Sequence, residues 1–234
     1  DFVENTTIGD SLYTVAYLPT STTKQIVKHQ YYTLSYNEKF EQAEWVAYYL
    51  TPASINGPQK RSSKFLADPL LSNPVGPGSY AKSGYDRGHL CPAADMKLNN
   101  TSMNESFYMS NMSPQTPSFN RGIWAKLEDK VRDWALQKNG VYVVTGPLLN
   151  KSCGFVARSI TVPCAYYKII FKQTKEGVEA IAFMLPNAGS SLPLQQFVVS
   201  IDYLESLTGI DFFASLSTAL DIFFAFFWFL QSSP

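Results

Sequence analysis

The pattern of apolar and polar positions divides the chain into strands and helices. Six segments are rich in aromatic and β-branched residues and predict strands: 11–18, 43–51, 105–112, 141–148, 165–172 and 178–184. The first two end at Pro19 and Pro52, and proline is a common boundary of a strand. We expect Lys175-Glu176-Gly177 to form the turn between the last two.

Two stretches follow the period of a helix instead. Within residues 120–139, apolar residues recur with the i, i+4, i+8, i+11 spacing of one buried face, and Gly140 follows as a stop. Within residues 191–207, apolar side chains also repeat at helical spacing, and Gly209 ends the predicted helix. We expect the first of these helices to bury one face against the rest of the protein.

A long segment, residues 52–84, holds many of the prolines and glycines and predicts an ordered loop, and long loops in compact domains are often functional. It contains a basic run, 59–65, for which a solvated turn and a contact with phosphate both remain open. Near the C-terminus, residues 222–230 are nine consecutive apolar residues. A membrane-spanning helix needs roughly twenty, so we expect this tail to pack on the core, with an exposed aromatic patch or partner surface as the alternative.

The composition favours one domain over residues 1–234. Of the 234 residues, 45% are hydrophobic and 16% charged, and no repeat or flexible linker divides them. Lys+Arg and Asp+Glu are both 19, so no overall field attracts nucleic acid or an anionic membrane. Residues 56–140, however, carry 11 basic and 7 acidic side chains, a balance of +4. We expect an anionic partner to bind this middle segment.

One stretch, residues 83–97, combines unlike chemical groups within a few positions: Asp86, Arg87 and His89. A neutral histidine can take a proton from water, and an arginine offers a planar fork for phosphate oxygens. A base beside an anion clamp predicts phosphodiester hydrolysis; an Asp–Arg surface pair in a turn is the simpler alternative. The other histidine, His29, has no carboxylate or thiol nearby in the sequence, so we interpret it as structural or exposed.

A second polar set lies along the first predicted helix. Asn120, Glu128 and Arg132 are separated by multiples of four and therefore share one stripe of the helix surface. Eight helical residues rise about 12 Å, so Glu128 can hold a water on a metal bound by Asn120 but can hardly bind that metal directly. Arg132 could orient Glu128 or contact phosphate, and an exposed Glu128–Arg132 ion pair without function is the alternative.

Together with the segment from Ser110 to Gln115, these residues resemble the DNA/RNA non-specific endonucleases of the ββα-metal class, and the likeness runs from about Ala43 to Phe213. The resemblance implies an α+β fold: a single domain with a central, mostly antiparallel β-sheet flanked by helices, containing a ββα-metal active-site motif. It also implies an endonuclease that depends on Mg²⁺, with Mn²⁺ as the alternative ion, and hydrolyses phosphodiester bonds in DNA and RNA.

Carried over residue by residue, the resemblance assigns eight site residues in this sequence. His89 is the general base, and Asn120 is the one protein ligand of a hydrated metal ion. Glu128 holds a metal-bound water, and Asp86 supports the metal site without binding the ion. The other four contact phosphate or support the site: Arg61, Arg87, Asn111 and Arg132. Lys60 stays open as the alternative to Arg61.

Two other classes of protein stay open. A nucleic-acid-binding protein without activity could use the same fold, because a fold does not guarantee a function. A structural zinc module could use His89 with Cys91, Cys153 and Cys164, although these cysteines lack a Cys-x-x-Cys pair. At most one disulfide can form among the three cysteines.

The expected partners are DNA and RNA as substrates and no membrane, and a homodimer remains open. The sequence starts at Asp1 rather than Met, and an unrestrained nuclease endangers the cell that makes it. Both points favour a secreted or periplasmic protein, with a mitochondrial location as the alternative.

Overall fold

The computed structural model describes residues 17–157, 159–175, 177–214 and 222–224. The strand predicted at 11–18 lies outside these ranges except for Tyr17 and Leu18, which are in irregular structure. Of the apolar tail, only Ile222–Phe224 is described, and it forms a strand, β12. No helix in the described ranges is both long and apolar enough to cross a membrane.

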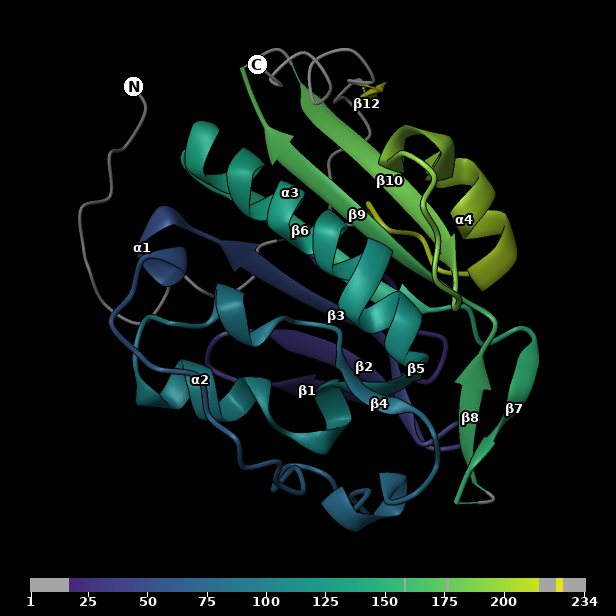
Figure 1. The fold of residues 1–234 in the computed structure, drawn as a ribbon. Coiled ribbons are helices and arrows are strands. Elements are labelled where there is room, and N and C mark those ends of the chain that lie inside the picture. Colours follow the sequence, from purple (N-terminus) through teal and green to yellow (C-terminus); the bar gives the residue numbers. More distant parts are fainter. Residues whose placement is uncertain (1–16, 158, 176, 215–221, 225–234) are drawn as a thin grey trace.

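A large sheet organises the structure (Figure 1). Its strands lie in the order β1 (Ile26–Lys28), β2 (Thr33–Asn37), β3 (Gln42–Leu50), β6 (Val141–Pro147), β9 (Ala165–Gln173), β10 (Val178–Pro186) and β11 (Val198–Val199). All neighbours in this order are antiparallel, and β12 pairs with β10 in parallel. The strands predicted at 43–51, 141–148, 165–172 and 178–184 are therefore confirmed.

Both faces of the central strands are buried, because a helix covers each face. On one face, α3 (Trp124–Gln137) contributes Leu127 and Val131 to a core that includes Val143 of β6. On the other, α4 (Ile201–Thr208) packs into a core that includes the next residue of the same strand, Val144, because successive strand residues point to opposite faces. The α+β fold with a largely antiparallel sheet is confirmed; a single domain over all 234 residues stays a prediction.

A smaller strand–strand–helix unit stands beside the large sheet (Figure 1). β4 (Asp86–His89) pairs antiparallel with β5 (Met112–Gln115), and a π-helical turn, η4 (Phe119–Ile123), leads into α3. A Cβ atom at Gly88 would lie 2.2 Å from side-chain atoms of the buried Gln115, so a larger residue at this position would force Gln115 to shift. The unit has the expected ββα order and carries His89 at the end of β4.

The segment 105–112 is not the predicted strand. It begins in α2 (Asn100–Ser106), continues through a short 3₁₀ turn, η3 (Met109–Asn111), and only its last residue belongs to β5. Asn99 starts α2 with a capping box, because its side chain accepts a hydrogen bond from the Ser102 amide and its own amide donates to Ser102 Oγ. This helix start outweighs the strand preference of the aromatic residues that follow.

The second predicted helix is shorter than 191–207. Residues Leu194–Phe197 form a 3₁₀ turn, η5, and β11 then pairs with β10. The α-helix therefore begins at Ile201, where Ser200 caps it, and it ends at Gly209, whose φ is 70°. The predicted loop at 52–84 is interrupted only by α1 (Pro52–Ile55), η1 (Pro77–Tyr80) and an isolated bridge at Leu66.

A second hairpin, β7 (Ser152–Val156) and β8 (Ile160–Pro163), is closed by a disulfide between Cys153 and Cys164. Cys91 is free and buried. The disulfide removes two of the four proposed zinc ligands, and no group of three or more His, Cys, Asp or Glu in the described residues is placed to hold a metal. The zinc-module alternative is therefore wrong.

Candidate active site

A cavity of about 400 Å³ lies where β4 meets η4 and α3. It is lined by Arg61, Phe65, Asp86, Arg87, His89, Pro92, Ala93, Ala94, Asn120, Arg121 and Glu128. Six of the eight predicted site residues line it, and Asn111 and Arg132 do not. Arg61 lines the cavity and Lys60 does not, which favours Arg61 as the upstream basic residue.

His89 is almost completely buried, with 8% of its surface exposed. Its ring meets Phe107 edge to face at a centroid distance of 4.9 Å and lies 5.8 Å from the Phe65 ring. Burial, together with the positive charges of Arg61 and Arg87, lowers the pKa of His89 to about 3. Its Nε2 atom is buried and has no hydrogen-bond partner among the described residues. The imidazole is therefore neutral near pH 7, and no described residue occupies its Nε2 atom.

Asp86 joins two neighbours in η4. It accepts a hydrogen bond from Asn120 Nδ2 at 2.8 Å and two from Arg121, at 2.9 and 2.7 Å. Burial opposes ionisation of Asp86, yet the hydrogen bonds from Arg121 and Asn120 lower its pKa overall. Because the amide nitrogen of Asn120 faces Asp86, its oxygen is the atom left to face a cation.

Glu128 follows Asn120 by two helical turns and is half-buried. Burial raises its pKa to about 7, against the opposing charge of Lys168. Lys168 itself is buried, donates to Thr145 Oγ1 at 2.6 Å and lies 4.8 Å from the centre of the Trp124 ring. Glu128 thus reaches the cavity with a buried ammonium group as its strongest electrostatic partner.

Arg132 pairs with two aspartates outside the cavity. Its guanidinium donates to Asp95 at 2.8 Å and to Asp129 one turn away, and it does not line the cavity. Asp95 is fully buried and requires this compensating charge. No ion pair between Arg132 and Glu128 is found in the described residues, and a contact of Arg132 with phosphate stays a prediction.

Two guanidinium groups face the cavity over aromatic rings. Arg87 lies 4.0 Å from the centre of the Phe65 ring and donates to the Pro77 carbonyl at 3.2 Å. Arg61 lies 5.2 Å from the centre of the Phe107 ring. Neither pairs with a carboxylate among the described residues. Their charges are thus available to an anion, and such planar groups match phosphate oxygens.

Asn111 is fully buried behind the cavity. Its side chain accepts from Cys91 N at 2.8 Å and donates to Cys91 O at 2.9 Å and to Ser106 O at 2.8 Å. The Leu90 amide also donates to the Asn111 carbonyl at 2.9 Å. Asn111 therefore fixes the backbone directly after His89 from behind the cavity.

Three aromatic or charged residues of this region were not predicted as site residues: Phe65, Arg121 and Lys168. Arg121 directly follows Asn120, but nothing in the sequence connects it with Asp86, 35 positions away. The basic run at 59–65 ends in Phe65 and was the one available signal for that ring.

The donor set fits a hydrated, hard divalent cation. One amide oxygen, from Asn120, lies in a cavity that also contains the carboxylates of Asp86 and Glu128. Mg²⁺ prefers oxygen donors and usually keeps several waters, so a single direct protein ligand is sufficient. A softer ion such as zinc prefers several nitrogen or sulfur ligands, whereas His89 is the one histidine and there is no cysteine among the residues that line this cavity.

The sequence and the fold are similar to those of known nucleases. The family model described as DNA/RNA non-specific endonuclease matches residues 11–219. A protein named Nuclease from Nostoc sp. is 38% identical over 208 residues, which cover 82% of this chain and 74% of the Nostoc protein. Endonuclease G, mitochondrial, from Bos taurus is 30% identical over 205 residues, which cover 80% of this chain and 69% of that protein.

A crystal structure of an EndoG/EndoGI complex, described in terms of EndoG inhibition, has the same fold with a TM-score of 0.74 and 31% sequence identity. The match covers 82% of this chain and 87% of the other. The residues that the family model matches, 11–219, include all residues that line the cavity around His89.

Proposed function

The chain belongs to the DNA/RNA non-specific endonuclease family, and from that premise we propose that it hydrolyses phosphodiester bonds in DNA and RNA at the cavity around His89. The relatives are named nucleases and endonucleases, which identifies the chain as a nucleic-acid hydrolase. The observation that carries the proposal for the site is a neutral, buried histidine between two guanidinium groups without carboxylate partners.

His89 is proposed as the general base. The charges of Arg61 and Arg87 help to lower its pKa, and a phosphate bound to them would offset those charges and raise the pKa toward neutrality. A base with a pKa near the working pH removes a proton from water most effectively. The bound substrate would thus raise the pKa of the base that activates the attacking water.

Asn120 is proposed as the direct ligand of Mg²⁺, with Mn²⁺ as the alternative, and Glu128 and Asp86 as acceptors for metal-bound water. When bound there, the cation would stabilise the negative charge that develops on the phosphate and the leaving oxygen. Asp86 keeps the Asn120 amide oriented through the hydrogen bond of 2.8 Å. Glu128, whose pKa is raised by burial, would ionise more readily beside a cation.

Arg61 and Arg87 are proposed to bind the phosphate on either side of the scissile bond. Contacts to phosphate fix the position of a nucleic acid but carry no information on base sequence. Since the predicted groups are a base, phosphate-binding arginines and a metal site, we expect weak sequence preference and cleavage of both DNA and RNA. The balance of +4 in residues 56–140 supports binding that weakens with salt.

For the location we propose an oxidising compartment, as in a secreted or periplasmic protein. The Cys153–Cys164 disulfide supports this proposal, because such bonds are rare where thiols are kept reduced. The mitochondrial name of the bovine relative supports the alternative location. A homodimer remains a prediction.

The experiment is a digestion of supercoiled plasmid and of unstructured RNA with the purified protein, with Mg²⁺, with Mn²⁺ and with a chelator. We expect both polymers to be cut in their interior with either ion and neither to be cut with the chelator. Undiminished cleavage in the presence of the chelator would refute the proposed requirement for a metal ion. No cleavage under any of these conditions would refute the proposed nuclease activity.

A further inference from the structure

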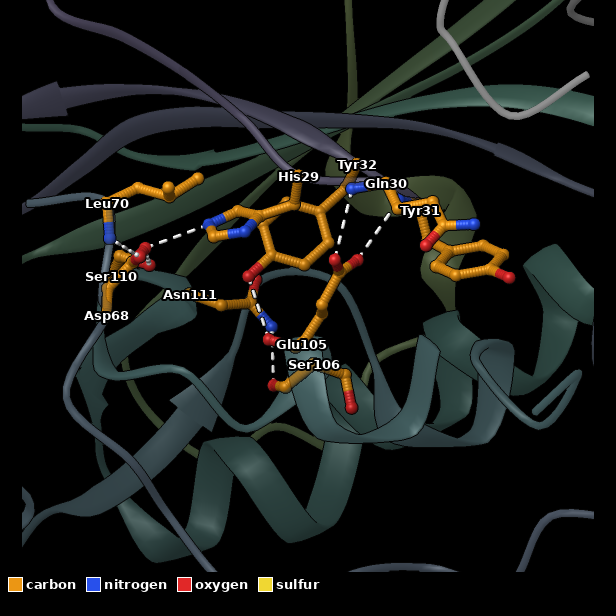
Figure 2. Close-up of polar contacts among 10 residues, drawn as sticks. All are labelled: His29, Gln30, Tyr31, Tyr32, Asp68, Leu70, Glu105, Ser106, Ser110 and Asn111. Atoms are coloured by element: carbon orange, nitrogen blue, oxygen red, sulfur yellow. Dashed lines mark hydrogen bonds and ion pairs between the residues drawn. The ribbon is translucent and has the colours of Figure 1, made fainter. Parts of the chain in front are cut away.

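A buried polar network ties the turn between β1 and β2 to the segments behind His89 (Figure 2). Its centre is Asp68, which is fully buried. The Asp68 carboxylate accepts hydrogen bonds from His29 Nε2 at 2.8 Å, from Ser110 Oγ and from the Leu70 amide at 2.9 Å. A charged group that is buried away from water is stable only when it is hydrogen-bonded in this way. The sequence near His29 offered no carboxylate partner, but the fold supplies one in Asp68, 39 positions away.

A second carboxylate, Glu105 at the end of α2, holds the same turn (Figure 2). Its two oxygens accept the backbone amides of Gln30 and Tyr31, each at 3.1 Å. The Tyr32 hydroxyl donates to the Glu105 carbonyl at 2.8 Å. Three successive residues of the turn thus bind one residue of α2, and the turn cannot move without α2.

The network is not a hydrolytic Ser–His–Asp site. In such a site the histidine lies between the other two residues and removes the serine proton. Here His29 and Ser110 both bind the same oxygen of Asp68. Only 3% of the His29 side chain is exposed, so a substrate cannot reach it.

Both carboxylates lie on segments that contact His89. The loop that contains Asp68 also contains Phe65, and it is held to the end of α2 by two backbone hydrogen bonds of Leu66, to Phe107 O at 3.1 Å and from Met109 N at 2.8 Å. Phe65 and Phe107 are the rings that pack against His89.

The other connection runs through η3. Ser110, bound to Asp68, directly precedes Asn111, whose side chain holds Cys91 and the carbonyl of Ser106 at the end of α2. The network therefore reaches both the aromatic walls of the His89 ring and the backbone that follows it.

We infer that His29, Asp68, Ser110 and Glu105 are positioning residues for the catalytic reaction. They hold the Phe65 and Phe107 rings that pack against His89, and they hold Asn111, which fixes the backbone after His89. Through these contacts they set the orientation of the His89 ring. The inference rests on the proposed function, in which His89 is the base. Displacement of a reacting group by about 1 Å can cost on the order of 100-fold in rate. Loss of the central carboxylate should therefore lower kcat, although none of these four residues lines the cavity.

The chain has only two histidines, so NMR spectra of the histidine rings report on His89 directly. The variant His29→Gln leaves one ring signal and assigns it to His89. In Asp68→Asn we expect the His89 signal to shift or broaden, because ring currents of two phenylalanines act on it, and Ser110→Ala should shift it less in the same direction.

The matched control is Glu44→Gln. Glu44 is a buried carboxylate too, with 4% exposure, and it accepts from Thr22 N at 2.9 Å and Ser35 Oγ at 2.7 Å. It does not line the His89 cavity. This variant should lower the melting temperature as Asp68→Asn does, but leave the His89 signal and kcat unchanged.

Steady-state cleavage of DNA gives the second readout. For Asp68→Asn we expect kcat to fall about 10- to 100-fold with KM changed by less than about twofold, because positioning of a base affects the chemical step and not substrate binding. If Asp68→Asn does not fold, Ser110→Ala takes its place in both measurements.

An unchanged His89 signal in Asp68→Asn and Ser110→Ala, with activity that declines only as in Glu44→Gln, would overturn the inference and leave the network a purely structural role. The NMR readout requires no activity. A protein that cleaves no nucleic acid would therefore refute the proposed function while the His89 signal still decides whether the network positions the ring.

Discussion

Arg121 holds Asp86 with two hydrogen bonds, from Nε to Oδ2 at 2.9 Å and from Nη2 to Oδ1 at 2.7 Å. The same carboxylate accepts the side-chain amide of Asn120 at 2.8 Å. The acid thus orients the proposed metal ligand, and the arginine orients the acid. Arg121 is largely exposed, so its effect on folding is small and its effect on the metal site is what can be measured.

The first prediction compares the loss of activity in Asp86→Ala with that in Arg121→Ala. Asp86→Ala removes the acceptor that orients Asn120, and the loss of such a supporting hydrogen bond typically costs about 10- to 100-fold in metal affinity or activity. Arg121→Ala leaves the Asn120–Asp86 hydrogen bond in place and should cost less. Cleavage rates at increasing Mg²⁺ concentration give both values, and an equal defect in the two variants would contradict the ranking.

The second prediction concerns Gly88. In Gly88→Ala, the new Cβ would lie 2.2 Å from side-chain atoms of Gln115, which is fully buried and would have to shift within a packed interior. Overpacking of this kind costs about 1 to 3 kcal/mol, so we expect a lower free energy of unfolding and a large loss of activity, because β4 carries His89.

Gly78→Ala is the matched control for Gly88→Ala. A Cβ at Gly78 meets nothing within 4 Å, so urea unfolding should show little change. A Gly88→Ala variant as stable and as active as Gly78→Ala would show that β4 and β5 are not packed as described.

The third prediction is a dependence of stability on pH. The pKa of His89 is lowered to about 3 in the folded protein, against about 6.5 for an ordinary histidine. Between these values the unfolded chain binds a proton and the folded protein does not, so the stability contributed by neutral His89 is present above pH 6.5 and lost as the pH falls toward 3.

Replacement by a residue that does not titrate removes this dependence. The difference in free energy of unfolding between the unchanged protein and His89→Gln should vary with pH, with a slope of up to about 1.4 kcal/mol per pH unit in that window. Chemical denaturation at a series of pH values measures it. Parallel curves for the two proteins would mean that His89 is not buried as a neutral base.

The fourth prediction separates Asn120 from Glu128. Asn120→Ala removes the only proposed direct protein ligand, so excess Mg²⁺ should restore little activity. Glu128→Ala removes an acceptor for metal-bound water and typically costs about 10- to 100-fold, which Mg²⁺ should partly restore. Circular dichroism verifies that α3 persists in both variants. Identical Mg²⁺ curves would rule out a mechanism with one direct ligand.

Four strands of the large sheet (β3, β6, β9 and β10) and α3 could be predicted from the sequence because each leaves a local pattern, whereas β1, β2 and β11 were not predicted. Strands such as β9 are largely buried and are rich in aromatic and β-branched residues, and α3 repeats its apolar side chains along one buried face. The segment 105–112 was misjudged for the opposite reason. The segment begins inside α2, and the start of that helix is set by the capping box of Asn99 and Ser102, which lies outside the aromatic run that suggested a strand.

In the candidate site, too, residues with a local sequence pattern could be predicted and residues placed by tertiary contacts could not. Asp86 and His89 could be assigned to the cavity because a short motif places unlike groups together in the sequence, and Asn120 because of its helical spacing from Glu128 and the family resemblance. Arg132 could not be placed correctly, because helical spacing brings it near Glu128 as well as Asp129, and the tertiary contact with buried Asp95 decides its position. The His29–Asp68 pair likewise joins residues that only the folded chain brings together.

The most direct test of the account is the initial rate of plasmid cleavage by His89→Ala in Mg²⁺, beside Tyr203→Ala, which truncates an exposed aromatic residue on α4. We predict that His89→Ala is slower by about 10² to 10⁴, the usual cost of removing a general base, while it binds nucleic acid as before and Tyr203→Ala remains fully active. A folded His89→Ala protein that cleaves plasmid at a rate close to that of the unchanged protein would contradict the central claim.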